Sequence, residues 1–292
     1  MKTPRISVGM PVYNSEQWIS DSIESILRQT FGDFELVISD NASTDGTEEI
    51  CREFSGKDER IRYYRNDCNI GASDNYNAVF HYSTGEYFKW ASSNDICKDT
   101  FLASCIEVLD ERPDVVLCYP KTRLFDGDPS NAKDYEDGLH LIDESACARF
   151  SGIIDRMGLN NVMNGVMRSE VLRRTALIKT FFSSDVSLMA ELALYGKFFE
   201  IPEYLFYRRM DEESATKLKT EKEVLKHYDP ELKNPMLFQN WKINLEYIKA
   251  IGRAPLGFSE KACLAKRIFR QLVWSRSELA QDVVQAWKSR FH

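Results

Sequence analysis

Three short apolar segments near the start of the chain each end abruptly at polar residues that favour loops. They are Ile6–Val12 followed by Tyr13-Asn14, Leu36–Ile38 followed by Ser39–Gly46, and Tyr87–Ala91 followed by Ser92–Asp95. Between the first two, apolar residues recur at the spacing of one helix face, at Ile19, Ile23, Ile26 and Leu27. Strand, helix and strand in this order predict an α/β protein whose mostly parallel, Rossmann-like sheet is flanked by helices.

The polar residues after these segments also predict where a ligand binds. In open α/β sheets, ligands bind beyond the carboxyl ends of the strands, and all three polar groups fall there. The same segments therefore indicate both the fold and the place of its site.

Length and composition are typical of a soluble globular protein, with 292 residues of which 43% are hydrophobic and 28% charged. No apolar run approaches the roughly 20 residues that span a bilayer, and the first five residues do not lead into a signal-peptide core. We therefore expect a cytoplasmic protein. The net charge of −7 is uneven, since residues 261–292 carry seven Lys/Arg and two acids. An acidic body with a basic tail argues against nucleic acid as a partner and leaves a membrane surface open.

Cysteine and histidine usage argues against a disulfide framework and a zinc site. The seven cysteines are odd in number, form no C-x-x-C pair and lie in several cases within apolar runs. We interpret them as reduced core thiols of a cytosolic protein. The four histidines lie far apart in the sequence and show no ligand-like spacing.

The pattern along the chain predicts three parts. A large domain covers residues 1–209, a charged linker covers 210–240, and apolar residues at helical spacing predict a helical extension over 241–292. Within the large domain, residues 120–143 are polar and without periodicity, so we expect a long surface loop there.

Asp40 lies between an apolar strand and a predicted helix. Its carboxylate could accept the N3–H of uracil or thymine while the Tyr13 ring stacks on the base. The alternative is that Asp40 and Asn41 only shape the turn, as Asx residues do, and spacing alone slightly favours this alternative.

Ser93, Asn94 and Asp95 end the third segment. Amide and carboxylate oxygens there could hold Mg²⁺ or Mn²⁺, which prefer hard oxygen ligands and often bridge diphosphate oxygens. The alternative is a helix N-cap formed by Asp95 or Asp99.

Asp185 opens a predicted amphipathic helix. A carboxylate at this place could take the proton of an attacking hydroxyl. It could equally be an N-cap that the helix dipole favours, and one residue can do both.

Taken together in order and spacing, these segments resemble glycosyltransferase family 2, whose members have the GT-A fold. The resemblance covers residues 5 to 209 and rests on five short motifs. They are Pro11-Val-Tyr-Asn14, Asp40-Asn-Ala-Ser-Thr-Asp-Gly46, Asn69-Ile-Gly71, Gly85-Glu-Tyr-Phe-Lys-Trp90 and Ser184-Asp185.

The resemblance implies an inverting enzyme that moves a sugar from a UDP- or dTDP-sugar to a hydroxyl of a saccharide or lipid-linked acceptor. Residues 1–119 would bind the nucleotide sugar and 120–209 the acceptor. Tyr13 and Asp40 would hold the base, and Asp185 would be the catalytic base. The remaining donor-binding positions implied by the family are Pro11, Asn14, Glu16, Asn69, Gly71, Ser93 and Asn94. A bacterial surface-polysaccharide pathway follows from this analogy alone.

The metal motif departs from the family. Ser93 and Asn94 stand where two aspartates are common, which should weaken a site for Mn²⁺ or Mg²⁺ built on Asn94 and Asp95. Asp211 stands where the family has a histidine that can reach the metal, and its charge could compensate. The rival hypothesis is that Arg208 or Arg209 neutralises the phosphates and metal is dispensable.

Two other functions stay open. One is a relative that has lost catalysis and only binds nucleotide sugar or a partner enzyme, which Ser93 and Asn94 favour. The other is a nucleotidyltransferase, although Pro11–Glu16 is neither the glycine-rich nor the basic phosphate loop that such an enzyme requires.

The C-terminal helices also allow two interpretations. Apolar residues beside Lys266, Arg267 and Arg270 could contact anionic lipid through 259–292. Packing of this face on the catalytic domain or on a twin subunit is the favoured alternative.

Overall fold

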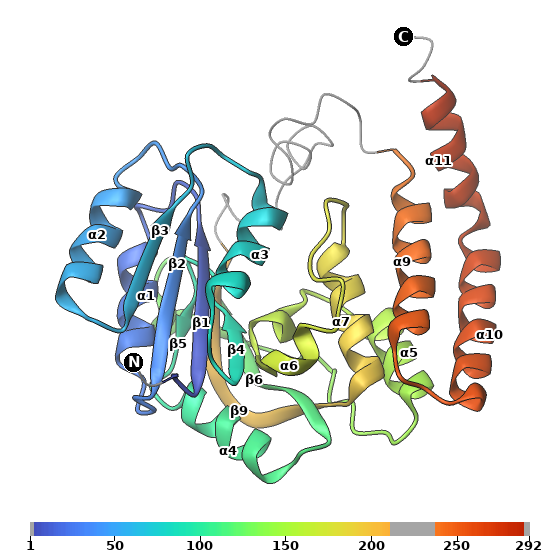
Figure 1. The fold of residues 1–292 in the computed structure, drawn as a ribbon, viewed down its shortest axis with the longest axis horizontal. Helices are drawn as coiled ribbons and strands as arrows, with labels where there is room; N and C mark the ends of the chain where they lie inside the picture. Colours follow the sequence, from blue (N-terminus) through green and yellow to red (C-terminus); the bar gives the residue numbers. More distant parts are fainter. Residues whose placement is uncertain (1–2, 211–236, 289–292) are drawn as a thin grey trace.

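A mixed nine-stranded sheet forms the centre of the part of the chain that the computed structural model describes, residues 3–210 and 237–288 (Figure 1). Its first half is parallel in the order β3-β2-β1-β4, with bounds β1 (Ile6–Val12), β2 (Phe34–Asp40), β3 (Ile61–Arg65) and β4 (Tyr87–Trp90). Its second half continues with β8 (Val166–Arg168), β6 (Val115–Phe125), β9 (Lys197–Arg209) and β5 (Ile96–Cys97). There β6 and β9 are parallel, while β8 and β5 run antiparallel to their neighbours. The predicted α/β fold is confirmed.

Helices cover both faces of the sheet, because successive side chains of a strand point to opposite faces. On one face, the inward side chains of β1 pack with α1 (Ile19–Leu27), α2 (Thr47–Lys57) and α4 (Phe101–Glu111). On the other face, Phe88 and Trp90 of β4 pack with α3 (Ala72–Tyr82), α5 (Ala146–Arg156), α6 (Ser169–Leu172) and α7 (Ser184–Tyr195). The helix predicted from Ile19, Ile23 and Ile26 is confirmed, and all three side chains are buried in α1.

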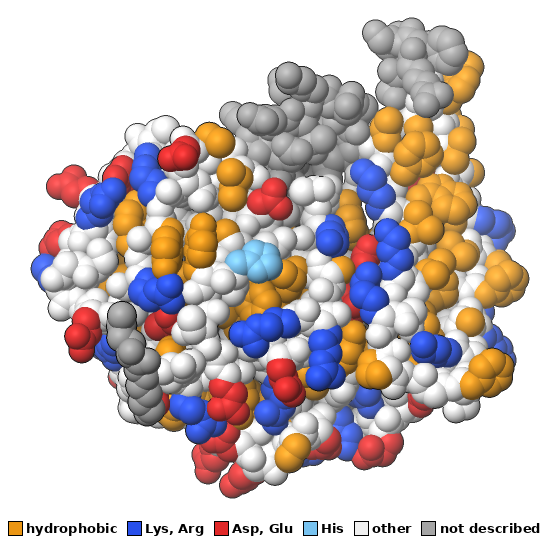
Figure 2. Space-filling view, in the orientation of Figure 1, with side chains coloured by type: hydrophobic (Ala, Val, Ile, Leu, Met, Phe, Trp, Pro, Cys, Tyr) orange, Lys and Arg blue, Asp and Glu red, His pale blue; other side chains and the backbone are white. Residues whose placement is uncertain are grey.

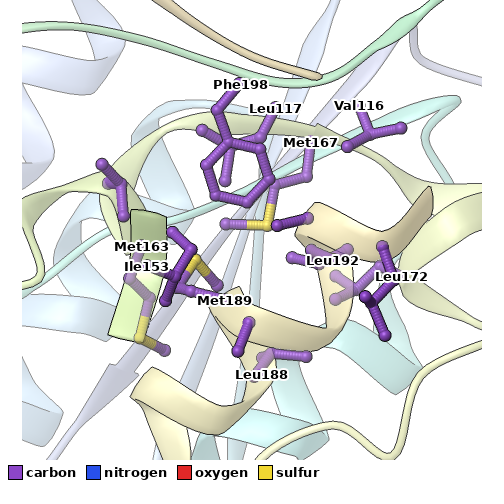
Figure 3. Close-up of a cluster of buried hydrophobic side chains, with 14 of the residues drawn as sticks. Val116, Leu117, Ile153, Met163, Met167, Leu172, Leu188, Met189, Leu192 and Phe198 are labelled. Carbon is purple, nitrogen blue, oxygen red and sulfur yellow. The ribbon is translucent and has the colours of Figure 1, made fainter. Parts of the chain in front are cut away.

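The core beneath α7 joins three parts of the second half of the fold (Figure 3). Phe198 of β9, Met163 of the short 3-10 helix η2 (Asn161–Asn164), and Leu188 and Met189 of α7 all belong to one buried cluster. The position of α7 relative to η2 and the sheet is therefore fixed by apolar packing.

The predicted helical extension is present as α9 (Gln239–Arg253), α10 (Phe258–Trp274) and α11 (Arg276–Lys288) (Figure 1). Its inner face packs on the large domain, with α9 against α7 and α10 against α5. None of the helices in the described part of the chain has both the length and the apolar content of a membrane span.

The interpretation of all seven cysteines as reduced thiols is wrong in one respect. Cys147 of α5 and Cys263 of α10 form a disulfide with their Cα atoms 6.1 Å apart. Cys51, Cys97, Cys105 and Cys118 are buried free thiols as expected, and Cys68 is an exposed one. The two bonded cysteines are 116 residues apart and meet only because α10 packs on α5, so local sequence carries no sign of the pair.

The prediction of a long surface loop over residues 120–143 is also wrong in part. β6 continues to Phe125, and β7 (Lys133–Tyr135) pairs antiparallel with it after a 3-10 turn, η1 (Pro129–Asn131). The polar composition suggested a loop because this part of β6 is only half-buried, so that only Thr122 and Phe125 face inward. Most of the predicted 210–240 linker, including the candidate ligand Asp211, lies outside the described residues.

Candidate active site

The loop after β1 is tied to the loop after β2 by side chains that the sequence predicted to shape the donor pocket. The Asn14 backbone N–H donates to Ser43 Oγ (2.9 Å), and Asn14 Oδ1 accepts from the Thr44 backbone N–H (2.8 Å). Glu16 Oε2 accepts from the Gly46 backbone N–H (2.6 Å). Pro11, inside β1, pairs in register with Ser39 of β2. Asn14 and Glu16 therefore shape this edge through bonds within the protein.

Asp40 is fully buried, and both of its carboxylate oxygens have partners. Oδ1 accepts from the Ser43 backbone N–H (2.8 Å), while Oδ2 accepts from the Tyr63 hydroxyl (2.7 Å) and from Arg65 Nη1 (2.5 Å). The turn-shaping role of Asp40 is thus present. A carboxylate has about four acceptor positions, so one is left over, but because the Asp40 side chain has no exposed surface a base N–H reaches it only if the surrounding loop moves. The Tyr13 ring beyond the end of β1 is 47% exposed, as a ring that stacks on a base must be.

The Asn69–Gly71 turn lies against the same loop. Asn69 Oδ1 accepts from Asn41 Nδ2 (2.8 Å) and from the Gly71 backbone N–H (2.9 Å). Gly71 has φ 85°, a left-handed conformation that glycine adopts without steric cost, and it leads directly into α3.

The residues after β4 form hydrogen bonds within the described part of the protein. The Ser93 hydroxyl contacts the Ser15 hydroxyl (2.8 Å), and the Asn94 main-chain oxygen accepts from Arg209 Nε (3.1 Å). Asp95 is buried and accepts from the Arg209 backbone N–H (2.9 Å), and burial raises the pKa of its carboxyl. Asp95 does not cap α4, whose N-cap is Thr100.

A divalent cation needs several hard oxygen ligands. Within 3–210 and 237–288 no group of three or more His, Cys, Asp or Glu side chains is placed to hold one. A Mn²⁺ or Mg²⁺ ion on Asn94 and Asp95 would therefore need further oxygen ligands, such as those of the donor diphosphate.

The two arginines proposed as alternative phosphate ligands are both engaged within the protein. The Arg209 guanidinium is 3.8 Å from the centroid of the Trp18 ring and 4.6 Å from that of Phe125, and the residue is 2% exposed. Arg208 Nη1 donates to the Leu159 main-chain oxygen and to Asn161 Oδ1 (2.7 Å). Neither guanidinium is free in this conformation.

Asp185 lies in the first turn of α7 and is half-buried. Its Oδ2 accepts from Asn160 Nδ2 (2.7 Å). The N-cap of α7 is Ser183, so the N-cap alternative for Asp185 is wrong, although a carboxylate in the first turn still benefits from the helix dipole.

Comparison with known proteins decides the family. Residues 7–181, more than half of the chain, match the family model described as Glycosyl transferase family 2. The chain belongs to this family. The glucosyltransferase WfgD of Escherichia coli, named for UDP-Glc and GlcNAc-diphosphoundecaprenol, is 38% identical over 91 residues, 31% of this chain and 35% of WfgD. The glycosyltransferase GlyG of Streptococcus pneumoniae is 33% identical over 113 residues, and the match covers 38% of each chain. The match thus spans well under half the length of these curated relatives.

Solved glycosyltransferase structures share the fold. S. aureus TarS in complex with UDP-GlcNAc superimposes with a TM-score of 0.69 at 19% identity, covering 94% of this chain and 74% of the TarS chain. A mannosyltransferase from Pyrobaculum calidifontis, solved with GDP-Man and Mn²⁺, gives a TM-score of 0.60 at 16% identity, covering 99% of this chain and 76% of that one. The predicted GT-A type of fold is confirmed.

Three polar residues of this family 2 glycosyltransferase site were not predicted from its sequence. Tyr76 of α3 lies near Asp95 and Asp185, and burial together with these two carboxylates raises the pKa of its hydroxyl to about 12. Asn160 and Asn161 link Asp185 to Arg208. Tyr76 stands between Asn75 and Asn77 in α3 and belongs to none of the five motifs. The pair Asn160 and Asn161 belongs to none of them either. Only the fold brings them to the site.

Proposed function

We propose that the chain is an inverting glycosyltransferase that moves a sugar from a UDP- or dTDP-sugar to a hydroxyl of a saccharide or lipid-linked acceptor. The observation that supports it most is the Asp185 carboxylate, half-buried at the start of α7 and held by Asn160 at 2.7 Å. A carboxylate with one oxygen held by a fixed donor is suited to general-base catalysis by the other.

In the proposed reaction, Asp185 accepts the proton of the acceptor hydroxyl as its oxygen attacks the anomeric carbon. The bond from that carbon to the diphosphate breaks on the opposite face, so the configuration inverts and the nucleoside diphosphate leaves with the bonding electrons. Tyr13 and Asp40 hold the base of the donor, and the loops joined by Asn14, Glu16, Asn69 and Gly71 form the walls of its pocket, with Ser93 and Asn94 at its floor.

The donor and acceptor classes are supported by the relatives. TarS was solved with UDP-GlcNAc, and the name of WfgD specifies a UDP-sugar and a diphosphoundecaprenol-linked acceptor. A role in bacterial surface-polysaccharide synthesis at the cytoplasmic side of the membrane fits such an acceptor. The Mn²⁺ or Mg²⁺ expected from the family stays a prediction, since the described residues hold no cluster of three His, Cys, Asp or Glu side chains and Asp211 lies outside them.

A peripheral contact with anionic lipid belongs to the same proposal. Hydrophobic side chains gather over the C-terminal helices, with Lys and Arg among them (Figure 2). Phe269 and Trp274 of α10 are 67% and 61% exposed, and Lys266 and Arg270 lie exposed beside them. Arg267, the third predicted cation, is instead buried and pairs with Asp155 at 2.5 Å. Aromatic side chains bordered by cations suit the interface of an anionic bilayer.

Vesicle binding tests this contact. We expect binding to vesicles containing anionic phosphatidylglycerol, weak binding to neutral phosphatidylcholine, and loss of binding in Phe269→Glu/Trp274→Glu. The matched control is Val284→Glu on α11, half exposed in the same extension. No binding by the wild type together with a dimer in sedimentation would instead assign this face to a second copy of the chain.

A catalytically impaired nucleotide-sugar-binding protein is the second candidate, favoured by Ser93 and Asn94 in place of aspartates and by the lack of an acidic cluster among the described residues. Calorimetric titration with UDP, dTDP and GDP, each with Mn²⁺ and with EDTA, comes first. A transfer assay with Asp185→Asn follows, in which we expect kcat to fall at least ~100-fold. Nucleotide binding without any transfer by the wild type supports the second candidate, and no nucleotide binding contradicts both.

A further inference from the structure

The segment that precedes η2 is held in place by a chain of polar contacts. Arg208 Nη1 donates to the Leu159 main-chain oxygen and to Asn161 Oδ1 (2.7 Å). Asn161 Nδ2 donates in turn to Asp137 Oδ1 (2.9 Å), whose Oδ2 accepts from the Thr122 hydroxyl (2.9 Å). The residues on either side of Asn160 are therefore anchored to β6 and β9.

Asn160 itself adopts a left-handed conformation with φ 51°. Asparagine tolerates this region better than most residues. The conformation accompanies a side chain that faces α7, where Nδ2 donates to Asp185 Oδ2 at 2.7 Å. Met163 of η2 and Leu188 of α7 lie in the same buried cluster (Figure 3), so packing holds the two backbones at a fixed separation.

The second polar atom of this amide is unused. Asn160 is 8% exposed, and its Oδ1 is buried without a hydrogen-bond partner in the described part of the chain. A buried carbonyl oxygen without a donor is unfavourable, and native structures rarely contain one unless a ligand or water supplies the donor. The missing donor must therefore come from water or from a ligand bound beside Asp185.

We infer that Asn160 positions the base and also binds the acceptor. Its Nδ2 fixes Asp185 Oδ2, which leaves Asp185 Oδ1 to take the proton, and its Oδ1 accepts a hydrogen bond from a second hydroxyl of the acceptor saccharide. A sugar with hydroxyls on neighbouring carbons offers both groups at once. This inference rests on the proposed function, because it requires Asp185 to be the base.

The test compares Asn160→Ala and Asn160→Asp with Asn131→Asp, which adds the same carboxylate on the exposed η1 turn. In Asn160→Ala we expect kcat to fall about 10- to 100-fold because the base is misplaced, with a rise in acceptor KM and unchanged UDP affinity. In Asn160→Asp two carboxylates adjoin, so the acid limb of the pH profile of kcat/KM should move upward by about one pH unit or more. Asn131→Asp should leave both quantities unchanged.

The outcomes separate this inference from the proposed function. If Asp185→Asn is inactive but both Asn160 variants keep the wild-type kcat, acceptor KM and pH profile, the role of Asn160 is refuted and the function stands. If Asp185→Asn keeps full transfer activity, both are refuted. UDP titration of each variant tests whether the donor half is folded. If Asn160→Ala fails to fold, the kinetics of the near-isosteric Asn160→Asp alone test the role of Asn160.

Discussion

Glu191 of α7 and Arg253 of α9 form an ion pair with Nε and Oε1 2.7 Å apart, at a point where the Glu191 side chain is only 2% exposed. Glu191 Oε2 also accepts from the Ala176 backbone N–H (3.0 Å), and a second Arg253 nitrogen donates to Glu246 (2.6 Å). The helix that carries Asp185 is thus tied to the C-terminal extension by a buried charge, as well as by apolar contacts.

We predict that Glu191→Ala lowers the free energy of unfolding by about 2–3 kcal/mol, because it leaves Arg253 without its buried partner. The value is below that of a fully buried pair, since Arg253 is partly exposed. Urea denaturation measures it, and Glu203→Ala at a surface position of β9 is the control. An unchanged midpoint for Glu191→Ala would mean that the extension is not coupled to α7 through this pair.

The structural role of Asp40 can be separated from its role in binding by comparing it with Arg65. Arg65 is the other member of the ion pair, but we do not expect it to contact the donor. Asp40→Ala and Arg65→Ala both break the 2.5 Å contact between them. We expect Asp40→Ala to weaken UDP binding by about tenfold or more, as loss of a charged hydrogen-bond acceptor does, and Arg65→Ala to weaken it much less.

Calorimetry with UDP and with N3-methylated UDP measures both effects. The methylated nucleotide should bind wild type weakly and distinguish little between wild type and Asp40→Ala. Equal losses of UDP affinity in the two variants would show that Asp40 acts only through the shape of its loop.

The first half of the fold and site could be predicted because each signal is local. The apolar run of β1 and the helical spacing of Ile19, Ile23 and Ile26 each lie within a few residues, and Asp40 and Asn69 stand in short motifs at strand ends. The Asn160–Asp185 contact joins residues 25 apart, with η2, β8 and α6 between them, so no spacing rule indicates it. The same holds for Thr122, which reaches Asp137 only because β6 continues past the point where its apolar pattern stops.

The Cys147–Cys263 disulfide should stabilise the docking of α10 on α5. Because it closes a loop of 116 residues, we expect Cys263→Ser to lower the free energy of unfolding by about 2–4 kcal/mol under oxidising conditions. Reductant should lower the Tm of the wild type and leave that of Cys263→Ser unchanged. Cys68→Ser, which removes an exposed free thiol, is the matched control. Alkylation of all seven cysteines in the unreduced, unfolded wild type would contradict the bond.

Asp137 makes stability depend on pH in a direction opposite to that of most carboxylates. Burial raises the pKa of its carboxyl from 3.8 to about 6, against hydrogen bonds from Thr122 and Asn161 that lower it. Between about pH 4 and pH 6 the Asp137 carboxyl therefore keeps its proton in the folded state and loses it in the unfolded chain. Its contribution to stability is complete below about pH 4, is lost as pH rises from about 4 to 6, and does not change further above that range.

Comparison with Asp137→Asn isolates this contribution, because the amide does not titrate. The free energy of unfolding of the variant minus that of the wild type should rise by about 2–3 kcal/mol between pH 4 and pH 6.5. The altered hydrogen bonds of the variant add an offset that does not change with pH. Urea denaturation at intervals of half a pH unit measures the curve. A constant difference across this range would show that Asp137 ionises normally, and the anchor of Asn161 would then be a charged carboxylate throughout.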